Sequence, residues 1–201
     1  MDVFSSSNSS FSIVNHRLMG GGVIHLECPK NRRGLGEPDM IILHYTAGMD
    51  AMSSAKFLVK PDVKASAHVV IGRDGQVIQM VPFNIEAWHA GKSSYGGRNE
   101  LNHNSIGIEL DNLGQLRLEG EKFVAECGKE VPVEEVYTED SEEVPTYWHD
   151  YTDVQMRVLN EECGLLVDTY PIGDIVGHSD VTSRKVDPGP ALRVADWIKF
   201  Y

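Results

Sequence analysis

Two histidines and an aspartate occupy positions where a metal site can be built. His44 ends the apolar run at residues 40–46, and His178 follows the short apolar run at 174–177, so each imidazole is expected where a buried strand ends. Asp187 follows His178 by nine residues. Strand ends of α/β domains collect ligands, and two imidazoles with a carboxylate suit a zinc ion that keeps one position open for water. A chain with eight histidines also offers such triples by chance, so the pattern alone remains a hypothesis.

Glu109 and Lys185 would complete a hydrolytic site. Glu109 lies in the run 105–110, on the opposite face from three apolar side chains, and a buried strand does not hold a carboxylate without a partner. Zinc lowers the pKa of water to about 7, a carboxylate takes the proton, and a cation offsets the charge that forms on the attacked oxygen. The alternatives are a strand carboxylate bonded to backbone or arginine, and a solvent-exposed loop lysine.

The elements that would position these residues alternate along the chain. Asp50 is a predicted N-cap, Asp74-Gly75 favours a tight hairpin turn, and Thr152 with Gln155 forms a capping box. Strands are predicted at 40–46, 67–72, 76–81, 105–110 and 174–177, and helices at 51–59, 153–170 and 191–200. This order predicts an α/β fold with a mixed central sheet flanked by helices.

The length of 201 residues predicts one domain, with a core at about 38–200, an N-terminal extension at 1–37 and an acidic insertion at 119–150. That insertion holds eleven acidic residues against two lysines, which is −9 of the net −12, and is predicted as a solvent-exposed loop or insertion. The negative charge argues against nucleic acid as a partner. No apolar run approaches the roughly 18–20 residues of a membrane span.

The N-terminal 19 residues are rich in Ser and Asn and lack the basic-then-apolar order of a secretory signal, so a cytoplasmic protein is predicted. The three cysteines are too scattered for a disulfide framework or a thiolate zinc site. Four further histidines are predicted to lie at the surface. They are His16, His25, His103 and His149.

An ordered set of motifs extends over residues 40–190. They are His44-Tyr-Thr-Ala-Gly48, Ser66-Ala-His68-Val-Val-Ile71, Arg73-Asp-Gly75, Ala87-Trp-His-Ala-Gly91, Ser94-Tyr-Gly-Gly-Arg98, Ser105-Ile-Gly-Ile-Glu-Leu110, Tyr147-Trp-His-Asp-Tyr-Thr152, Gly177-His178 and Arg184-Lys-Val-Asp-Pro-Gly-Pro190. With this set the chain resembles the zinc-dependent N-acetylmuramoyl-L-alanine amidases of the AmpD type, which are related to the peptidoglycan-recognition proteins.

The resemblance implies roles for these residues. His44, His178 and Asp187 match the three ligands of a single zinc ion, Glu109 the acid/base glutamate, and Lys185 the lysine that helps stabilise the tetrahedral intermediate. The implied reaction is hydrolysis of the amide between the lactyl group of N-acetylmuramic acid and L-alanine, with muropeptides or peptidoglycan as partners. The implied fold is again a mixed sheet flanked by helices.

Further residues fall in motifs that line or support the substrate groove of this family. The candidate substrate contacts are Tyr45, Trp88, His89 and Arg98, and His68 is a candidate second-shell residue. Plain packing is the alternative for Trp88, and a surface position is the alternative for Arg98, whose guanidinium would suit an anionic stem peptide.

Two other functions remain open at this point. The first is a peptidoglycan-binding module without catalysis, but relatives of that kind typically lack a metal ligand, and all three positions are filled here. The second is a phage or interbacterial lytic amidase that acts on intact wall. No basic surface for an anionic wall is indicated, which favours a small muropeptide and intracellular recycling.

Overall fold

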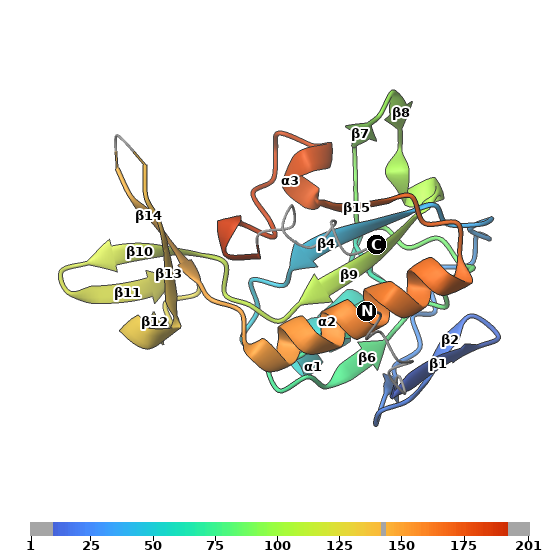
Figure 1. The fold of residues 1–201 in the computed structure, drawn as a ribbon, viewed down its shortest axis with the longest axis horizontal. Coiled ribbons are helices and arrows are strands. Elements are labelled where there is room, and N and C mark those ends of the chain that lie inside the picture. Colours follow the sequence, from blue (N-terminus) through green and yellow to red (C-terminus); the bar gives the residue numbers. More distant parts are fainter. Residues whose placement is uncertain (1–9, 142–143, 193–201) are drawn as a thin grey trace, which may run out of the picture.

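A six-stranded mixed sheet forms the centre of the protein in this computed structural model, which describes residues 10–141 and 144–192 (Figure 1). Its strands are β3 (Ile24–His25), β4 (Met40–Tyr45), β5 (Val69–Ile71), β6 (Val77–Gln79), β9 (Ser105–Leu110) and β15 (Asp174–Gly177). They lie in the order β15-β4-β9-β5-β6-β3. The first four of these are mutually parallel, and β6 is antiparallel to β5. The carboxyl ends of β15, β4 and β9 therefore meet at one edge.

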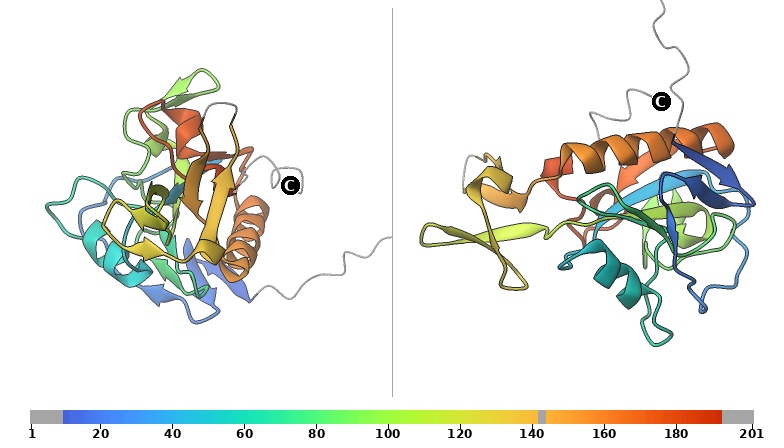
Figure 2. Two further views of the ribbon diagram at one scale, coloured as in Figure 1. Left: turned by 90° about the vertical axis from the view of Figure 1, so that its left-hand side faces the viewer. Right: turned by 90° about the horizontal axis from the view of Figure 1, so that it is seen from below.

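Helices α1 (Ala51–Leu58) and α2 (Asp153–Thr169) cover opposite faces of this sheet (Figure 2). On the α1 face, Ala55 packs in one apolar cluster with Val70 of β5. On the α2 face, Leu159 and Leu166 pack with Ile41 of β4. The alternation of each strand thus fills two cores at once, and the predicted α/β architecture is confirmed.

The predicted helix starts are also confirmed. The Asp50 side chain accepts a hydrogen bond from Ser53 N at 2.8 Å. Thr152 Oγ1 accepts from Gln155 N at 3.1 Å, and the Gln155 side chain accepts in return from the Thr152 backbone, which completes the capping box. Between the two strands of the predicted hairpin, Gly75 adopts a φ of 83°, which the turn requires.

The segment predicted as an N-terminal extension contributes to the core. Strands β1 (Phe11–Val14) and β2 (Arg17–Gly20) pair as a hairpin. Phe11 and Leu18 of this hairpin are buried in the cluster beneath α2. Strand β3 then pairs with β6 at the edge of the central sheet.

Of the two alternatives predicted for 119–150, a solvent-exposed loop or an insertion, the described residues rule out the loop, because they form strands. This segment, with the residues just before it, forms a five-stranded antiparallel sheet that projects from the body of the molecule (Figure 1). Its strands are β10 (Gln115–Glu119), β11 (Lys122–Ala125), β12 (Glu130–Val131), β13 (Val136–Glu139) and β14 (Thr146–His149), with η2 (Val133–Glu135) between β12 and β13. We call this unit the acidic sheet. Leu113, Leu116, Ala125 and Val131 form its own small apolar cluster.

The remaining elements are short. They are β7 (Ser94–Tyr95), β8 (Arg98–Asn99), η1 (Leu101–His103), α3 (His178–Val181) and η3 (Pro190–Leu192). The helix predicted at 191–200 lies outside the described residues from position 193 onward. Among the helices within residues 10–141 and 144–192, none has both the length and the apolar character needed to cross a lipid bilayer.

Candidate metal centre and catalytic site

His44, His178 and Asp187 converge at the edge where β4 and β15 end. The Nδ1 atoms of the two histidines lie 3.1 Å apart, and Asp187 Oδ2 lies 3.0 Å from His44 Nδ1 and 2.9 Å from His178 Nδ1. One ligand atom of each residue lies within 4.8 Å of the other two, and all three residues are buried. Ligands bound tetrahedrally to zinc at about 2.0–2.1 Å are about 3.3 Å apart, so the cluster fits such an ion.

The protonation states of the cluster suit a cation. Burial, as the largest effect, lowers the pKa of His44, which favours the neutral imidazole. For Asp187, burial acts to raise the pKa, but hydrogen bonds from His178 and His44 together hold it well below its usual value. Neutral imidazole and ionised carboxylate are the forms that bind metal.

His89 contacts the His44 ring at Nε2, the nitrogen that does not face the cluster. Its Nδ1 lies 3.1 Å from His44 Nε2, and its Nε2 lies 3.4 Å from the carbonyl oxygen of Ser105. Gly107 leaves room for this ring, because a Cβ at that position would lie 2.3 Å from His89 Cγ. A partner on the second nitrogen of a ligating histidine fixes its tautomer and orientation. The geometry therefore favours a supporting role for His89 over substrate contact.

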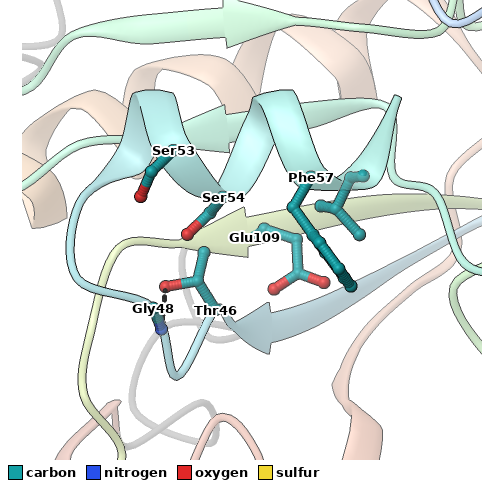
Figure 3. Close-up of a pocket in the computed structure, with 7 residues that line it drawn as sticks. Thr46, Gly48, Ser53, Ser54, Phe57 and Glu109 are labelled. Carbon is teal, nitrogen blue, oxygen red and sulfur yellow. Dashed lines mark hydrogen bonds between the residues drawn. The ribbon is translucent and has the colours of Figure 1, made fainter. Parts of the chain in front are cut away.

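Glu109 lies beside His44 in the register of β4 and β9. Its side chain points into a pocket of about 240 Å³ between β4, β9 and α1 (Figure 3). The pocket is lined by Thr46, Gly48, Ser53, Ser54, Phe57, Leu58 and Glu109. Within the described residues, Oε2 of Glu109 is buried and has no hydrogen-bond partner. An unpartnered carboxyl oxygen beside three converging ligands is free to act on a water or a substrate proton.

The electrostatics of Glu109 also suit an acid/base group. Burial, and to a smaller extent Asp187, raise the pKa of this carboxyl to about 8 against the opposing effect of Lys185. Lys185 also lowers the pKa of His44, so the lysine lies within electrostatic range of both residues. A carboxyl with a pKa near neutrality can both take up and return a proton. The side chain of Lys185 is exposed, as a group that meets substrate needs to be.

Tyr45 and Trp88 differ in their surroundings. Tyr45 directly follows His44, and burial raises the pKa of its phenol to about 12, with smaller contributions from Asp187 and Glu126. Trp88 is 37% exposed, and the Lys30 ammonium lies 5.9 Å from its ring centroid. Tyr45 is thus within electrostatic range of Asp187, whereas Trp88 is partly exposed and has the Lys30 ammonium over its ring.

Arg98 is not brought to the cluster. Its Nη1 donates to both carboxylate oxygens of Asp39, at 2.7 and 2.8 Å, and its Nη2 donates to Asp174 at 3.3 Å. These aspartates lie where β4 and β15 begin, at the opposite end of the strands from the two histidines. This favours the surface alternative for Arg98, in which it ties the β7–β8 hairpin to the sheet.

His68 holds the backbone rather than the cluster. Its Nδ1 accepts from Gly107 N at 3.0 Å, its Nε2 lies 3.0 Å from the Ile85 carbonyl oxygen, and burial lowers its pKa to about 4. Its ring meets that of His89 edge-on, with centroids 5.8 Å apart. His68 thus supports the strand and the ring that in turn support His44.

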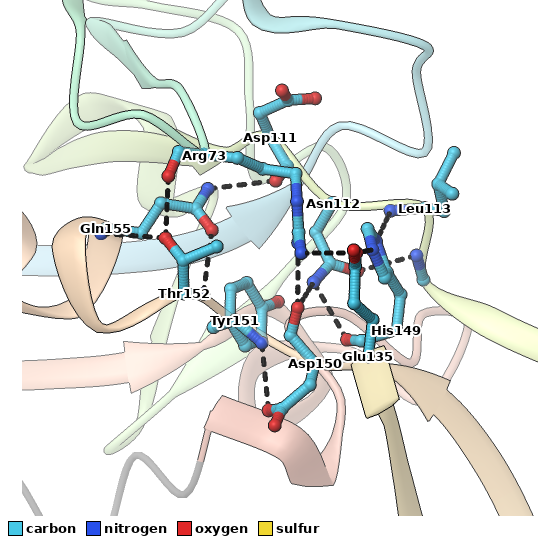
Figure 4. A network of polar contacts seen from close by, with 11 residues as sticks. Arg73, Asp111, Asn112, Leu113, Glu135, His149, Asp150, Tyr151, Thr152 and Gln155 are labelled. Carbon is cyan, nitrogen blue, oxygen red and sulfur yellow. Dashed lines mark hydrogen bonds and ion pairs between the residues drawn. The ribbon is translucent and has the colours of Figure 1, made fainter. Parts of the chain in front are cut away.

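The surface position predicted for His149 is wrong, because this residue is 3% exposed. Its Nδ1 accepts from Leu113 N at 3.0 Å, and its Nε2 lies 3.2 Å from Glu135 Oε2 (Figure 4). Arg73 donates to the same Glu135 oxygen at 2.8 Å and to the Asp150 carbonyl oxygen at 2.8 Å. This network joins the acidic sheet to the end of β9. The sequence feature that could have indicated a buried His149 is its place in the motif from Tyr147 to Thr152.

Two histidines and an aspartate that converge at one edge of a mixed sheet, with a glutamate beside them, define a site suited to metal-dependent hydrolysis. The chain belongs to the Amidase_2 family, N-acetylmuramoyl-L-alanine amidase, whose profile matches residues 34–190. This confirms the resemblance seen in the motifs and the fold that it implied.

Individual relatives agree with this assignment. The chain is 33% identical over 159 residues to the 1,6-anhydro-N-acetylmuramyl-L-alanine amidase AmpD of Escherichia coli, covering 78% of this chain and 67% of AmpD. A crystal structure of a selenomethionine derivative of AmpD is similar at a TM-score of 0.61 and 25% identity, covering 93% of this chain and 97% of that one. AmpDh3 of Pseudomonas aeruginosa, in complex with an anhydromuramic pentapeptide, is similar at a TM-score of 0.58 and 26% identity, covering 98% of this chain and 66% of AmpDh3.

Proposed function

We propose that this chain hydrolyses the amide between the lactyl group of N-acetylmuramic acid and L-alanine in muropeptides, with one zinc ion held by His44, His178 and Asp187. The observation that carries the proposal is the convergence of these three ligand atoms beside the unpartnered carboxyl oxygen of Glu109. A binding module would need neither that free oxygen nor a complete ligand set. Membership of the amidase family supports the same reaction.

The residues of the chain divide the reaction between them. When bound, zinc lowers the pKa of a coordinated water and polarises the carbonyl that is attacked. Glu109 takes a proton from the attacking water and later gives it to the departing alanine nitrogen. Lys185 offsets the negative charge that develops on the carbonyl oxygen. His89 keeps the His44 ring in the ligating orientation.

We further propose a small muropeptide as the substrate and the cytoplasm as the setting. The names of AmpD and the AmpDh3 complex both refer to anhydromuramyl compounds, and the acidic charge of this chain does not suit adhesion to an anionic wall. Parallel assays on anhydro-muropeptides and intact sacculi test this. Faster release of peptide from the sacculi would instead favour a lytic amidase.

Replacement of Glu109 by Gln tests the reaction itself. Glutamine keeps the shape of the side chain but cannot take up the proton, so turnover should fall by about a thousandfold or more while zinc remains near one ion per chain. The measurements are release of L-alanine-initiated peptide from one muropeptide and metal analysis of the purified protein.

Each outcome has a clear reading. Full activity of Glu109→Gln would show that the acid/base group is wrongly assigned. Wild-type protein that binds muropeptide with micromolar affinity but releases no peptide would favour the non-catalytic binding module.

A further inference from the structure

Lys30, in the loop between β3 and β4, is hydrogen-bonded to the segment that follows helix α1. Its ammonium donates to four backbone carbonyl oxygens, which lie 28 to 35 positions further along the chain. They belong to Leu58 at 2.7 Å, Lys60 at 3.0 Å, Val63 at 2.6 Å and Ala65 at 2.7 Å. One side chain therefore fixes the whole segment 58–65 from a distant loop.

This cluster acts directly on the pocket that holds Glu109. Phe57 and Leu58, the last two residues of α1, line that pocket (Figure 3). The final carbonyl groups of a helix have no partner within it and form the negative end of its dipole. An ammonium on the Leu58 carbonyl oxygen is favourable for both reasons, and it fixes the backbone of a residue in the pocket wall.

The same ammonium reaches Trp88, a candidate substrate contact. It lies 5.9 Å from the centroid of the Trp88 ring. Directly after the segment 58–65, Ser66 N donates to the Trp88 carbonyl oxygen at 3.0 Å, and Trp88 N donates to Ser66 Oγ at 2.9 Å. Lys30 thus contacts the ring of Trp88 and also holds the segment that binds the Trp88 backbone.

We propose that Lys30 is a positioning residue for substrate binding, whose ammonium holds the segment 58–65 and the Trp88 ring in the arrangement that receives the muropeptide. This rests on the proposed function. Phe57 is 52% exposed and Trp88 is 37% exposed, so both offer apolar surface that a ligand can cover. A neutral side chain at position 30 would leave the four carbonyl groups without this donor, and the segment would no longer be fixed.

The chemical step should not depend on Lys30. His89, which follows Trp88 and contacts His44, has contacts of its own, because His89 N donates to Asn102 Oδ1 at 3.1 Å and its ring lies against Ser105. Loss of the ammonium should therefore weaken the binding of substrate while the metal ligands and Glu109 keep their places.

The test is Lys30→Met, which keeps most of the length of the side chain and removes the charge. KM should rise by about five- to twentyfold, while kcat stays within about twofold and zinc near one ion per chain. Amide hydrogen exchange should become faster in residues 58–66 and stay unchanged in β4 and β9. Arg32→Met is the matched control and should keep both constants, because Arg32 carries the same charge in the same loop and its Nε donates to the Pro29 carbonyl oxygen of that loop.

A second variant separates charge from packing. Lys30→Ala lacks the three carbons and the ammonium that propylammonium contains, so added propylammonium should lower the KM of this variant towards the wild-type value. The neutral 1-propanol, of similar shape, should not. An equal effect of the two compounds, or none from either, would contradict a role for the ammonium.

The remaining outcomes separate this inference from the proposed function. A wild-type KM in Lys30→Met would overturn the positioning role, and so would a loss of zinc or of kcat as large as the rise in KM, since Lys30 would then serve the fold or the metal site. Failure of the amidase assignment is recognised independently, because the wild type itself would then release no peptide.

Discussion

Glu109 on β9 and Glu162 on α2 are two glutamates whose pKa is raised in the same direction but whose surroundings differ. Burial raises the pKa of each carboxyl to about 8. Within the described residues, Oε2 of Glu109 and both carboxyl oxygens of Glu162 are buried without hydrogen-bond partners. On acidity alone, the two residues could not be distinguished.

Their neighbours separate them. Glu109 opens onto a pocket and lies within range of Lys185 and the metal ligand Asp187. Glu162 lies on the buried face of α2. Burial, and to a smaller extent the charge of Glu162, raises the pKa of the neighbouring Cys163 thiol, so this thiol stays protonated and inert. A shifted pKa therefore indicates catalysis only where the group also opens onto a pocket and lies near metal ligands and a charge of opposite sign.

Removal of a metal ligand should have the largest effect of the changes considered, because it removes the cation that distinguishes the surroundings of Glu109 from those of Glu162. In His178→Ala, Glu109 would remain a buried carboxyl but would lose the neighbouring cation, so its surroundings would resemble those of Glu162. Zinc content should fall well below one ion per chain, and kcat/KM by about a thousandfold or more. His25→Ala is the control, because His25 is exposed on β3 and should keep both metal and activity.

Gly107→Ala tests whether the metal site depends on the support of His44 by His89. An added Cβ would lie 2.3 Å from the His89 ring, so the ring must move away from His44. Zinc affinity should fall by about 10- to 100-fold, as found when the partners of ligating histidines are lost. Gly36→Ala is the control, because a Cβ there meets nothing within 4 Å. Unchanged affinity, measured by chelator competition, would show that His89 does not orient His44.

The strands and helix starts around His44 and His178 could be predicted from the sequence for a physical reason. The strands are buried on both faces and the helices are capped, so apolar runs, Asp50 and Thr152 marked them locally. The family motifs then related His44 to residues more than 130 positions away, which no local pattern could do.

The acidic sheet was missed because its stabilising contacts are few and distant in sequence. Its strands are short and few of their residues are buried, and its apolar cluster takes single residues from separate strands, so neither period nor composition showed it. His149 can be buried because its ring nitrogens have partners in Glu135 and the Leu113 backbone, and Arg73 on another loop completes the network. The support of His44 by His89 likewise depends on the missing side chain of Gly107.

The smallest predicted effect, on stability alone, concerns Glu162. Its pKa is about 8 in the folded protein against a reference value of 4.5, so its contribution to stability is fully present below about pH 4.5 and is lost as the pH rises through 8. Glu162→Met removes the carboxyl at similar volume and should raise the free energy of unfolding at pH 8 by about 1–3 kcal/mol.

Denaturant unfolding of this variant between pH 5 and 9 separates the two glutamates. The gain of Glu162→Met over the wild type should grow with pH, because the wild type must keep a carboxyl neutral or bury its charge, whereas methionine does neither. Asp168→Asn, at an exposed position of the same helix, should show no such pH-dependent gain. Peptide release should stay at the wild-type rate in both variants. A gain that does not change with pH would mean that Glu162 titrates normally, and a loss of turnover would mean that the acidity of α2 serves the reaction after all.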